Sequence, residues 1–316
     1  MVVLRADPWN PDYGAGAEAP FEDDSVPVVV DTSVETEAWD RPLAPDPCAP
    51  EPVIFVDGVM RIDMRVLAQD GDRRAWGLLG SYASGGVRCS DSAAFVLGED
   101  PVGRALILGG RINSTPLELT AGGCRISYLT RSIADDSPTT QRRVLQRLMI
   151  EAEQRTAMDL ANGELVFADG PLHINTGGRV VGVIKRMVTA YLKDEAAALL
   201  PHLKPRERTP VFALGNSVLD RFAWYQRLIP LESTWHELAG LVRCEVRMEL
   251  GLDEAIRMAD RVACVLPDYS GRPGVDPRAP QNLTPVGALE THLRHRLGHP
   301  TVIRRALQSR LMEEPT

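Results

Sequence analysis

The sequence predicts an α/β fold in which one mixed sheet is flanked by helices. Strand-like segments come first, and helix and strand patterns alternate after about residue 137, an order typical of a mixed sheet covered by helices. Two of the apolar β segments end in the same dipeptide, Asp57-Gly58 and Asp169-Gly170. Two buried strands of one sheet can bring such residues to a common edge, so the pattern also predicts where these carboxylates meet.

The composition of the 316 residues, with 44% hydrophobic and 25% charged residues, is ordinary for a soluble globular protein. No apolar run is long enough to cross a membrane, and the N-terminus lacks a signal-peptide pattern. We therefore expect a cytoplasmic protein with no membrane contact. The five cysteines are scattered and form no CxxC pair, so neither a disulfide framework nor a zinc site is predicted.

Two regions are expected: an acidic, proline-rich leader over residues 1–52, and one domain over residues 53–316. The leader holds 12 acidic and 2 basic residues and nine of the 24 prolines, for a net charge of −10, which leaves +2 for the rest of the chain. Such a composition favours an extended or partly ordered segment. Residues 25–30 are expected to add one short strand.

The first half of the domain is predicted to be β structure. Strands are expected over residues 53–66, 75–87, 93–97 and 104–108, the first with apolar and polar side chains alternating at a period of two. The glycines around residues 80–86 lack the GxxxxGK[ST] and GxGxxG spacings of phosphate loops. Hairpin turns explain them better, and ATP hydrolysis is excluded.

The second half alternates helices and strands. Ser137-Pro138 supplies an N-cap and an N1 proline for a long helix that ends near Asn162-Gly163. The last clear helix runs from Thr284-Pro285 to Gly298. Between these two helices we expect, in chain order, a strand over 165–169, a strand over 179–186, a helix over 188–200, strands over 210–214, 222–229 and 241–250, a helix over 253–262 and an irregular stretch over 267–282.

Asp57 and Asp169 have two interpretations. An Asp-Gly pair between β segments is a strong hairpin signal, so each could be only a turn residue. Alternatively, the two carboxylates converge with a glutamate of the intervening helix, Glu151 or Glu153. Hard divalent cations take oxygen ligands, and clustered carboxylates repel each other until a cation neutralises them. Hydrolysis of a phosphodiester by bound metal ions uses several acidic residues from different elements in this way.

Five segments resemble, in order, the successive motifs of NurA nucleases. The segments are residues 53–59, the helix glutamate, residues 169–172, residues 182–186, and residues 284–292, in which a proline is followed seven residues later by His292. The resemblance spans roughly residues 53–297. It departs from the family pattern at Val59, where a small hydroxyl residue often follows Asp-Gly.

The resemblance implies an RNase H-like fold and a manganese-dependent (or magnesium-dependent) nuclease that trims DNA 5′ ends and cuts single strands. It also implies a homodimer that works with a hexameric HerA-type ATPase translocase in the processing of DNA double-strand breaks. Asp57 would be the central metal ligand, Asp169 the second aspartate, and His292 a residue that ligates metal or positions water. Helical phase favours Glu153 as the helix ligand, whereas the distance ahead of Asp169 favours Glu151, so both remain candidates.

Further basic residues have two interpretations each. Lys185 either stabilises charge that develops on a phosphate or is a solvent-facing strand lysine. His295 and His299 are expected at the surface. The basic C-terminal residues form either a solvated face or a contact for phosphates or a partner; they are Arg294, Arg296, Arg304, Arg305 and Arg310.

The sequence therefore predicts a divalent-metal-dependent deoxyribonuclease whose candidate site comprises Asp57, Asp169, Glu151 or Glu153, His292 and Lys185. The alternative is a non-catalytic docking subunit of a DNA translocase complex, in which the carboxylates are turn residues. A metal-dependent phosphatase of small substrates is a third hypothesis, which the sequence does not support with a recognisable small-ligand site.

Overall fold

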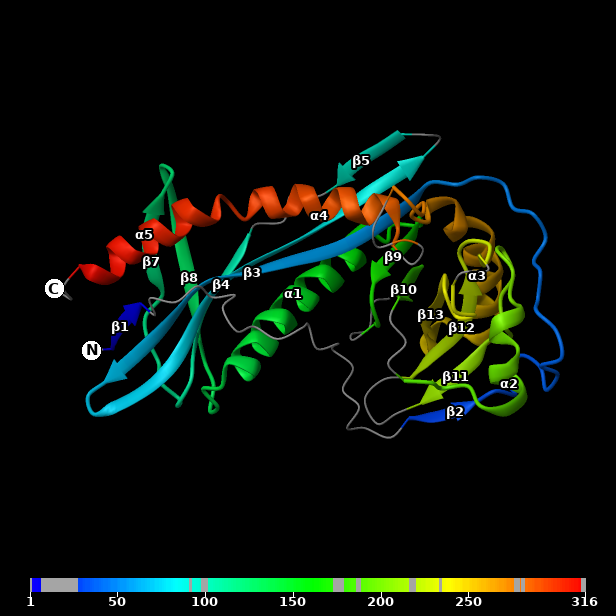
Figure 1. The fold of residues 1–316 in the computed structure, drawn as a ribbon, viewed down its shortest axis with the longest axis horizontal. Coiled ribbons are helices and arrows are strands. Elements are labelled where there is room, and N and C mark those ends of the chain that lie inside the picture. Colours follow the sequence, from blue (N-terminus) through cyan, green and yellow to red (C-terminus); the bar gives the residue numbers. More distant parts are fainter. Residues whose placement is uncertain are drawn as a thin grey trace.

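The computed structural model describes residues 2–6, 28–90, 93–97, 102–172, 179–185, 189–215, 220–232, 235–275, 279 and 282–313. Within these residues, one mixed sheet of 13 strands organises the fold (Figure 1). Along its main path the strand order is β2-β11-β12-β13-β10-β9-β3-β4-β6-β8-β7, with β1 paired to β3 and β5 to β4. The predicted α/β class, a mixed sheet flanked by helices, is confirmed.

The strands are β1 Val3–Ala6, β2 Val29–Asp31, β3 Val53–Asp70, β4 Arg73–Ser90, β5 Ala93–Leu97, β6 Gly103–Leu108, β7 Leu117–Ala121, β8 Cys124–Ser132, β9 Leu165–Asp169, β10 Val180–Ile184, β11 Phe212–Gly215, β12 Arg221–Arg227 and β13 Leu241–Arg247. The α-helices are α1 Pro138–Leu160, α2 Asp194–Ala198, α3 Leu252–Val265, α4 Thr284–Arg296 and α5 Pro300–Met312.

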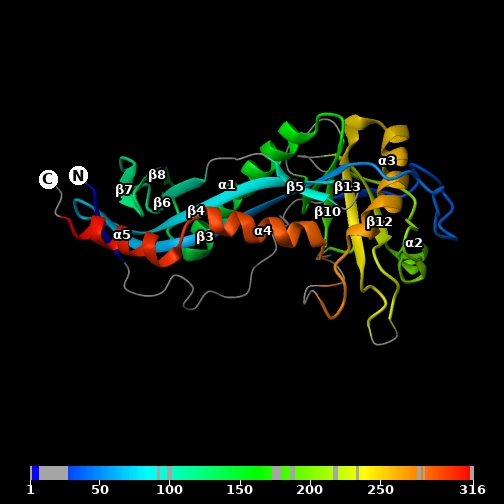
Figure 2. The ribbon, with the colours of Figure 1, turned by 90° about the horizontal axis from the view of Figure 1, so that it is seen from above.

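The long hairpin of β3 and β4 is the axis of the molecule, and helices cover both of its faces. Figure 2 shows α4 and α5 along one side of this hairpin and α1 along the other. A side chain placed at Gly86 would meet Leu160 of α1 at 2.4 Å, whereas one at Gly85 would meet Leu293 of α4 at 3.1 Å. Because adjacent residues of a strand face opposite ways, these glycines let both helices pack against β4 at nearly the same point.

β3 continues without interruption through Asp57-Gly58, so the hairpin-turn interpretation of Asp57 is wrong. Asp57 pairs with Gly85 and Gly58 with Ser84 in an antiparallel register. The turn between β3 and β4 lies instead at Gly71 and Asp72, where Gly71 has φ 59°. Eighteen residues of β3 pair in large part with β4, and this long pairing outweighs the local turn preference of one Asp-Gly pair.

Two predicted elements are shorter than the sequence analysis expected. The helix expected over 188–200 is shorter: α2 spans Asp194–Ala198 and is followed by a 3₁₀ turn, and residues 186–188 lie outside the described residues. The backbone at Lys193 is extended, and Leu192 packs into an apolar cluster with Phe212. The strand expected over 241–250 ends at Arg247.

Helix α5 and strands β7 and β8 were not predicted. Gly298 and Pro300 lie shortly after Arg296, the last residue of α4. Pro300 occupies the first turn of α5. A proline at this position loses no helix hydrogen bond, because an N–H there would have no partner within the helix. β7 and β8 form a hairpin through the glycines at 122 and 123, both with positive φ.

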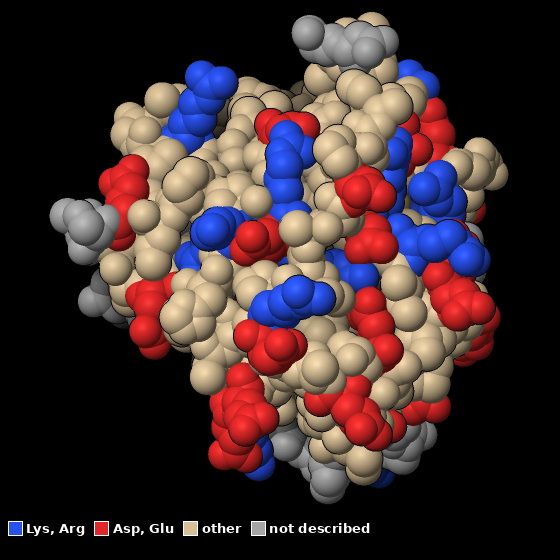
Figure 3. Space-filling view, turned by 90° about the vertical axis from the view of Figure 1, so that its right-hand side faces the viewer, with Lys and Arg blue, Asp and Glu red and all other residues tan. Residues whose placement is uncertain are grey.

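The end of the molecule that carries α2 and α3 has a surface of mixed charge. Figure 3 shows Lys and Arg side chains interspersed with Asp and Glu over this face. Ion pairs in this part of the chain include Arg206 with Asp268 at 2.5 Å and Arg257 with Glu254 at 2.7 Å. This face therefore offers no broad patch of one sign, the kind of surface to which a polyanion is attracted.

The described parts of the leader pack against the domain. β1 pairs with β3 and β2 with β11, and Glu35 accepts hydrogen bonds at 2.9 Å from two nitrogens of Arg208. Further along, Glu51 accepts from Arg261 at 2.5 Å. The predicted division into a leader over residues 1–52 and a domain over residues 53–316 stays a prediction.

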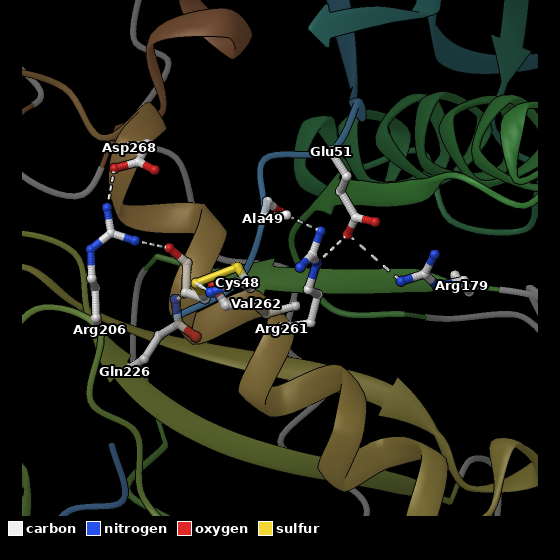
Figure 4. Close-up of a disulfide and its surroundings, with 10 residues drawn as sticks. Cys48, Ala49, Glu51, Arg179, Arg206, Gln226, Arg261, Val262 and Asp268 are labelled. Atoms are coloured by element: carbon white, nitrogen blue, oxygen red, sulfur yellow. Dashed lines mark hydrogen bonds and ion pairs between the residues drawn. A yellow bond between two sulfur atoms is a disulfide. The ribbon is translucent and has the colours of Figure 1, made fainter. Parts of the chain in front are cut away.

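The expectation that the cysteines form no disulfide is wrong for one pair. Cys48 of the leader and Cys264 of α3 are joined across a sequence separation of 216 residues (Figure 4). The Cα atoms are 6.3 Å apart, within the range that a disulfide spans. The spacing of the cysteines in the sequence could not reveal this pair, because only the fold brings the two residues together.

No helix among the described residues has the length and apolar character needed to cross a membrane.

Candidate active site

Asp57 and Asp169 meet at one end of a parallel strand pair. β3 and β9 are parallel, and Val56 is opposite Ala168, one residue before each aspartate. Two residues upstream, the rings of Phe55 and Phe167 stack with centroids 5.1 Å apart. Since side chains two apart in a strand share a face, both aspartates project on the same face of the sheet. This is the convergence that the two Asp-Gly endings predicted.

Lys185 reaches the same point from β10. Val183 of β10 is opposite Asp169, and Lys185 follows two residues later on the same face. Its Nζ lies 2.9 Å from Asp169 Oδ2, with side-chain exposures of 17% and 29%. Lys185 is therefore a partly buried cation within the acidic group, in contrast to the alternative of a solvent-facing strand lysine.

Glu153 of α1 completes this group from the opposite face. Its side chain is buried and accepts a hydrogen bond from the backbone N–H of Asp169. A methyl group at Gly58 would lie 3.3 Å from Glu153 Oε2 and 3.0 Å from Met149 Cγ. The glycine after Asp57 therefore leaves room for the glutamate to rest against the strand.

Glu151 is not brought into the group. Two residues along an α-helix correspond to a rotation of about 200°, so Glu151 and Glu153 point to nearly opposite sides of α1. Glu151 is only partly buried, whereas Glu153 has 5% of its surface exposed. Of the two candidates left open by the sequence, the structure brings Glu153 to the aspartates.

Burial and mutual repulsion make this group electrostatically unusual. Loss of hydration raises the pKa of Asp57 well above its ordinary value, and the Asp169 charge raises it further, while Lys185 opposes the rise. The pKa of Glu153 is raised in the same way, first by burial and then by Asp57 and Asp169. Asp57 Oδ2 is buried and has no hydrogen-bond partner among the residues that the structure describes, a state that is costly for a carboxylate oxygen.

Helix α4 brings an additional carboxylate, Glu290, that sequence reasoning missed. The charge of Glu290 raises the pKa of Asp57, so it acts on the site from the face that Leu289 and Leu293 cover. The signal was present in the helical pattern: Glu290 lies four residues after Val286 and three before Leu293, on the apolar side of the helix. A charged residue at such a position is a candidate for a site.

His292 is exposed on α4. It lies two residues beyond Glu290 and hence about 200° around the helix, so the structure does not bring it to the aspartates. His295 and His299 are also exposed, as expected.

The carboxylates fit a divalent cation in donor type and in charge. Asp57, Glu153 and Asp169 supply hard oxygen donors, and the unpartnered Oδ2 of Asp57 is the kind of atom that a cation satisfies. As they stand, however, no three His, Cys, Asp or Glu side chains of the described residues are placed to hold a metal ion together. The Lys185 ammonium instead supplies part of the compensating charge.

Comparison with protein-family models finds no match for this chain, and comparison with curated proteins finds none. Among solved structures, the NurA nuclease from Sulfolobus solfataricus is similar, with a TM-score of 0.49 and 10% sequence identity over 88% of this chain and 92% of that chain. At this identity the similarity concerns the fold alone, and no site residue is assigned from it.

Proposed function

We propose that the protein is a divalent-metal-dependent deoxyribonuclease that hydrolyses phosphodiester bonds at the site of Asp57, Asp169 and Glu153. The observation that carries the proposal is the meeting of Asp57, inside β3, with Asp169, at the end of β9, and a buried helix glutamate, while Asp57 Oδ2 has no hydrogen-bond partner among the described residues. Carboxylates gathered in this way raise one another's pKa and favour a bound cation. The ordered motifs that resemble NurA nucleases supply the substrate class.

In this proposal Asp57, Glu153 and Asp169 would hold Mn²⁺ or Mg²⁺. Such an ion supplies Lewis-acid stabilisation of charge on the phosphate and lowers the pKa of bound water. The net reaction adds water to phosphorus, breaks one P–O ester bond and transfers a proton to the leaving oxygen.

Lys185 would act on the phosphate itself. Its ammonium is fixed beside Asp169 and only partly exposed, so it can donate a hydrogen bond to a phosphate oxygen as negative charge develops there. The contact with Asp169 holds the ammonium in place before substrate arrives. Glu290 adds negative charge on the α4 side of the site.

The same proposal includes specific activities and partners, which depend on the resemblance of the motifs. The protein would trim DNA 5′ ends and cut single strands. It would act as a homodimer, together with a HerA-type translocase, at double-strand breaks.

The test is hydrolysis of end-labelled single-stranded DNA by the full chain in Mn²⁺, in Mg²⁺ and in EDTA. Asp57→Asn and Asp169→Asn should each lower the rate by about 100-fold or more, the effect of losing a group that stabilises transition-state charge. Asp159→Asn is the matched control, because Asp159 is an exposed residue of the same helix as Glu153. Activity that persists unchanged in both site variants would rule out this mechanism.

A non-catalytic docking subunit of a DNA translocase is the second candidate. It is favoured by the ion pair of Lys185 and Asp169 and by the lack, among the described residues, of three side chains already placed around a metal position. In that case the buried charges would be structural, and neither Mn²⁺ binding nor hydrolysis would be observed.

A further inference from the structure

A cavity lies at the junction of α4 and α5. Its volume is about 510 Å³, and it is lined by Met60 and Arg61 of β3 and by residues between Thr291 and Pro300. The cavity is open to solvent on the side of the exposed residues Arg294, His295 and His299. It is large enough for a phosphate group together with part of a sugar.

The lining of this cavity carries basic groups and no acidic ones. Arg61, Arg294, His295 and His299 contribute to it, and none of its lining residues is Asp or Glu. The whole chain, by contrast, has a net charge of −8. The mixed surface of Figure 3 shows no comparable separation of charge. Since the leader accounts for −10 of the net charge and residues 53–316 carry +2, the cavity is a local site for an anion on a nearly neutral domain.

Arg61 forms a fixed basic wall of the cavity. Its guanidinium donates to Asp63 at 2.8 Å and to the carbonyl oxygens of Gly298 and Leu297 at 2.7 and 3.2 Å. Asp63 also interacts with Arg104, whose Nη1 is 3.8 Å away. One buried carboxylate thus faces two guanidinium groups, and a net positive charge remains at the end of α4.

Two elements, β3 and α4, lead from the candidate active site to the cavity. Arg61 follows Asp57 by four residues on the same face of β3, a distance of about 13 Å for a strand. Arg294 follows Glu290 by four residues on α4, which is about 6 Å along a helix. A DNA strand with one phosphate at Asp57 would therefore reach the cavity within roughly four nucleotides, at about 3.4 Å for each.

We propose that this cavity binds a backbone phosphate of the DNA strand that enters the candidate active site. The inference rests on the proposed function and names how that site would hold its substrate. Arg294 and His295 would contact the phosphate, while Arg61 contributes fixed charge. Phosphate contacts of this kind carry no base information, so the cavity binds DNA irrespective of sequence.

The experiment measures binding of fluorescein-labelled single-stranded DNA by anisotropy, as a function of salt, with hydrolysis suppressed by Asp57→Asn. In this background Arg294→Gln should weaken binding about 3- to 10-fold and reduce the slope of log K against log salt by about 0.7 for the one lost contact. Arg294→Lys should restore most of the binding. Arg294 Nη2 also lies 3.8 Å from Glu290 Oε2. His295→Gln, made separately, should therefore weaken binding in the same direction, which excludes an effect that acts only through this ion pair.

The matched control is Arg305→Gln, which removes one exposed charge of α5 outside the cavity and should leave both quantities unchanged. Equal losses in Arg294→Gln and Arg305→Gln, or no loss in either, would overturn the inference, because binding would then depend on overall charge or on another surface. If binding gave either of these results while the wild-type chain cleaved DNA normally, phosphate binding by the cavity would be rejected and the proposed function would be kept. A specific effect of Arg294→Gln without any cleavage in Mn²⁺ would reject the proposed function and keep the cavity. A chain that binds no DNA would reject both.

Discussion

Lys185 Nζ and Asp169 Oδ2 are 2.9 Å apart, and this ion pair places a positive charge inside a group of carboxylates. The same ammonium opposes the rise in pKa of Asp57 and Glu153. Lys185 therefore has two possible effects, on the stability of the metal-free site and on the phosphate of a substrate. Substitution separates the two.

Lys185→Met should destabilise the metal-free chain by about 1–2 kcal/mol, between the values for exposed and buried ion pairs. Urea denaturation in EDTA measures this loss. In saturating Mn²⁺ the loss should shrink, because a bound cation would supply the missing charge. Lys204→Met, at an exposed position, is the control. An equal loss with and without Mn²⁺ would favour the docking-subunit hypothesis.

Asp57→Asn should stabilise the metal-free chain, since it removes a buried charge that repels Asp169. A group whose pKa is raised by folding stabilises the folded state at pH values below its unfolded pKa of about 4, and this contribution is lost as the pH rises through the folded pKa. The advantage of Asp57→Asn over the wild type should thus grow as the pH increases from 4 in EDTA. A gain of about 1 kcal/mol corresponds to a rise in Tm of about 2 °C for a chain of this size. Differential scanning fluorimetry at several pH values measures it, and lower stability of the variant throughout would contradict the repulsion that the geometry implies.

Glu153 and Glu151 form a matched pair for testing metal binding. Mn²⁺ at 100 times its Kd should stabilise the wild-type chain by about 2.7 kcal/mol. This stabilisation should be reduced strongly in Glu153→Gln and kept in Glu151→Gln, because only Glu153 is buried beside the aspartates. Thermal unfolding with and without Mn²⁺ measures both. Loss of the shift in Glu151→Gln alone would mean that the helix ligand has been assigned to the wrong side of α1.

Sequence reasoning predicted the meeting of Asp57 and Asp169 from the apolar β residues that precede each of them, a local pattern that the fold preserves in the paired strands β3 and β9. It left open whether Asp57 lies in a turn, since a local Asp-Gly preference cannot be weighed from the sequence against the long pairing of β3 with β4. The choice between Glu151 and Glu153 stayed open because helical phase favoured Glu153 and the distance ahead of Asp169 favoured Glu151. Cys48 and Cys264 are 216 residues apart, and only the folded chain shows that they are neighbours.

Glu290 and His292 provide a further test, because the sequence motif favours the histidine and the geometry favours the glutamate. Glu290→Gln should lower the pKa of Asp57 and so alter the pH dependence of hydrolysis, since the Glu290 charge raises that pKa. His292→Ala should leave the Mn²⁺-dependent shift in Tm unchanged, because His292 is exposed. Rates measured from pH 5 to 9, with thermal unfolding on the same variants, decide between them. Loss of the Mn²⁺ shift in His292→Ala would show that α4 rotates or moves when metal binds.

The bond between Cys48 and Cys264 should make stability depend on redox conditions. It closes a loop of 216 residues between the leader and α3, beside the contacts of Arg261 with Glu51 and with Ala49 (Figure 4). Reduction, or Cys264→Ser, should cost about 2–4 kcal/mol, the usual effect of removing a disulfide. Urea denaturation with and without dithiothreitol measures the difference, and alkylation followed by mass spectrometry counts the free thiols.

Two controls make this result specific. Cys124 is exposed and unpaired, so Cys124→Ser should leave stability unchanged in both conditions. The double variant Cys48→Ser, Cys264→Ser should respond to neither oxidation nor reduction, because the ion pairs that remain around Arg261 do not involve sulfur. If the oxidised wild type were no more stable than the double variant, the leader would be held by its strand pairing and ion pairs alone, and the disulfide would contribute nothing to the fold.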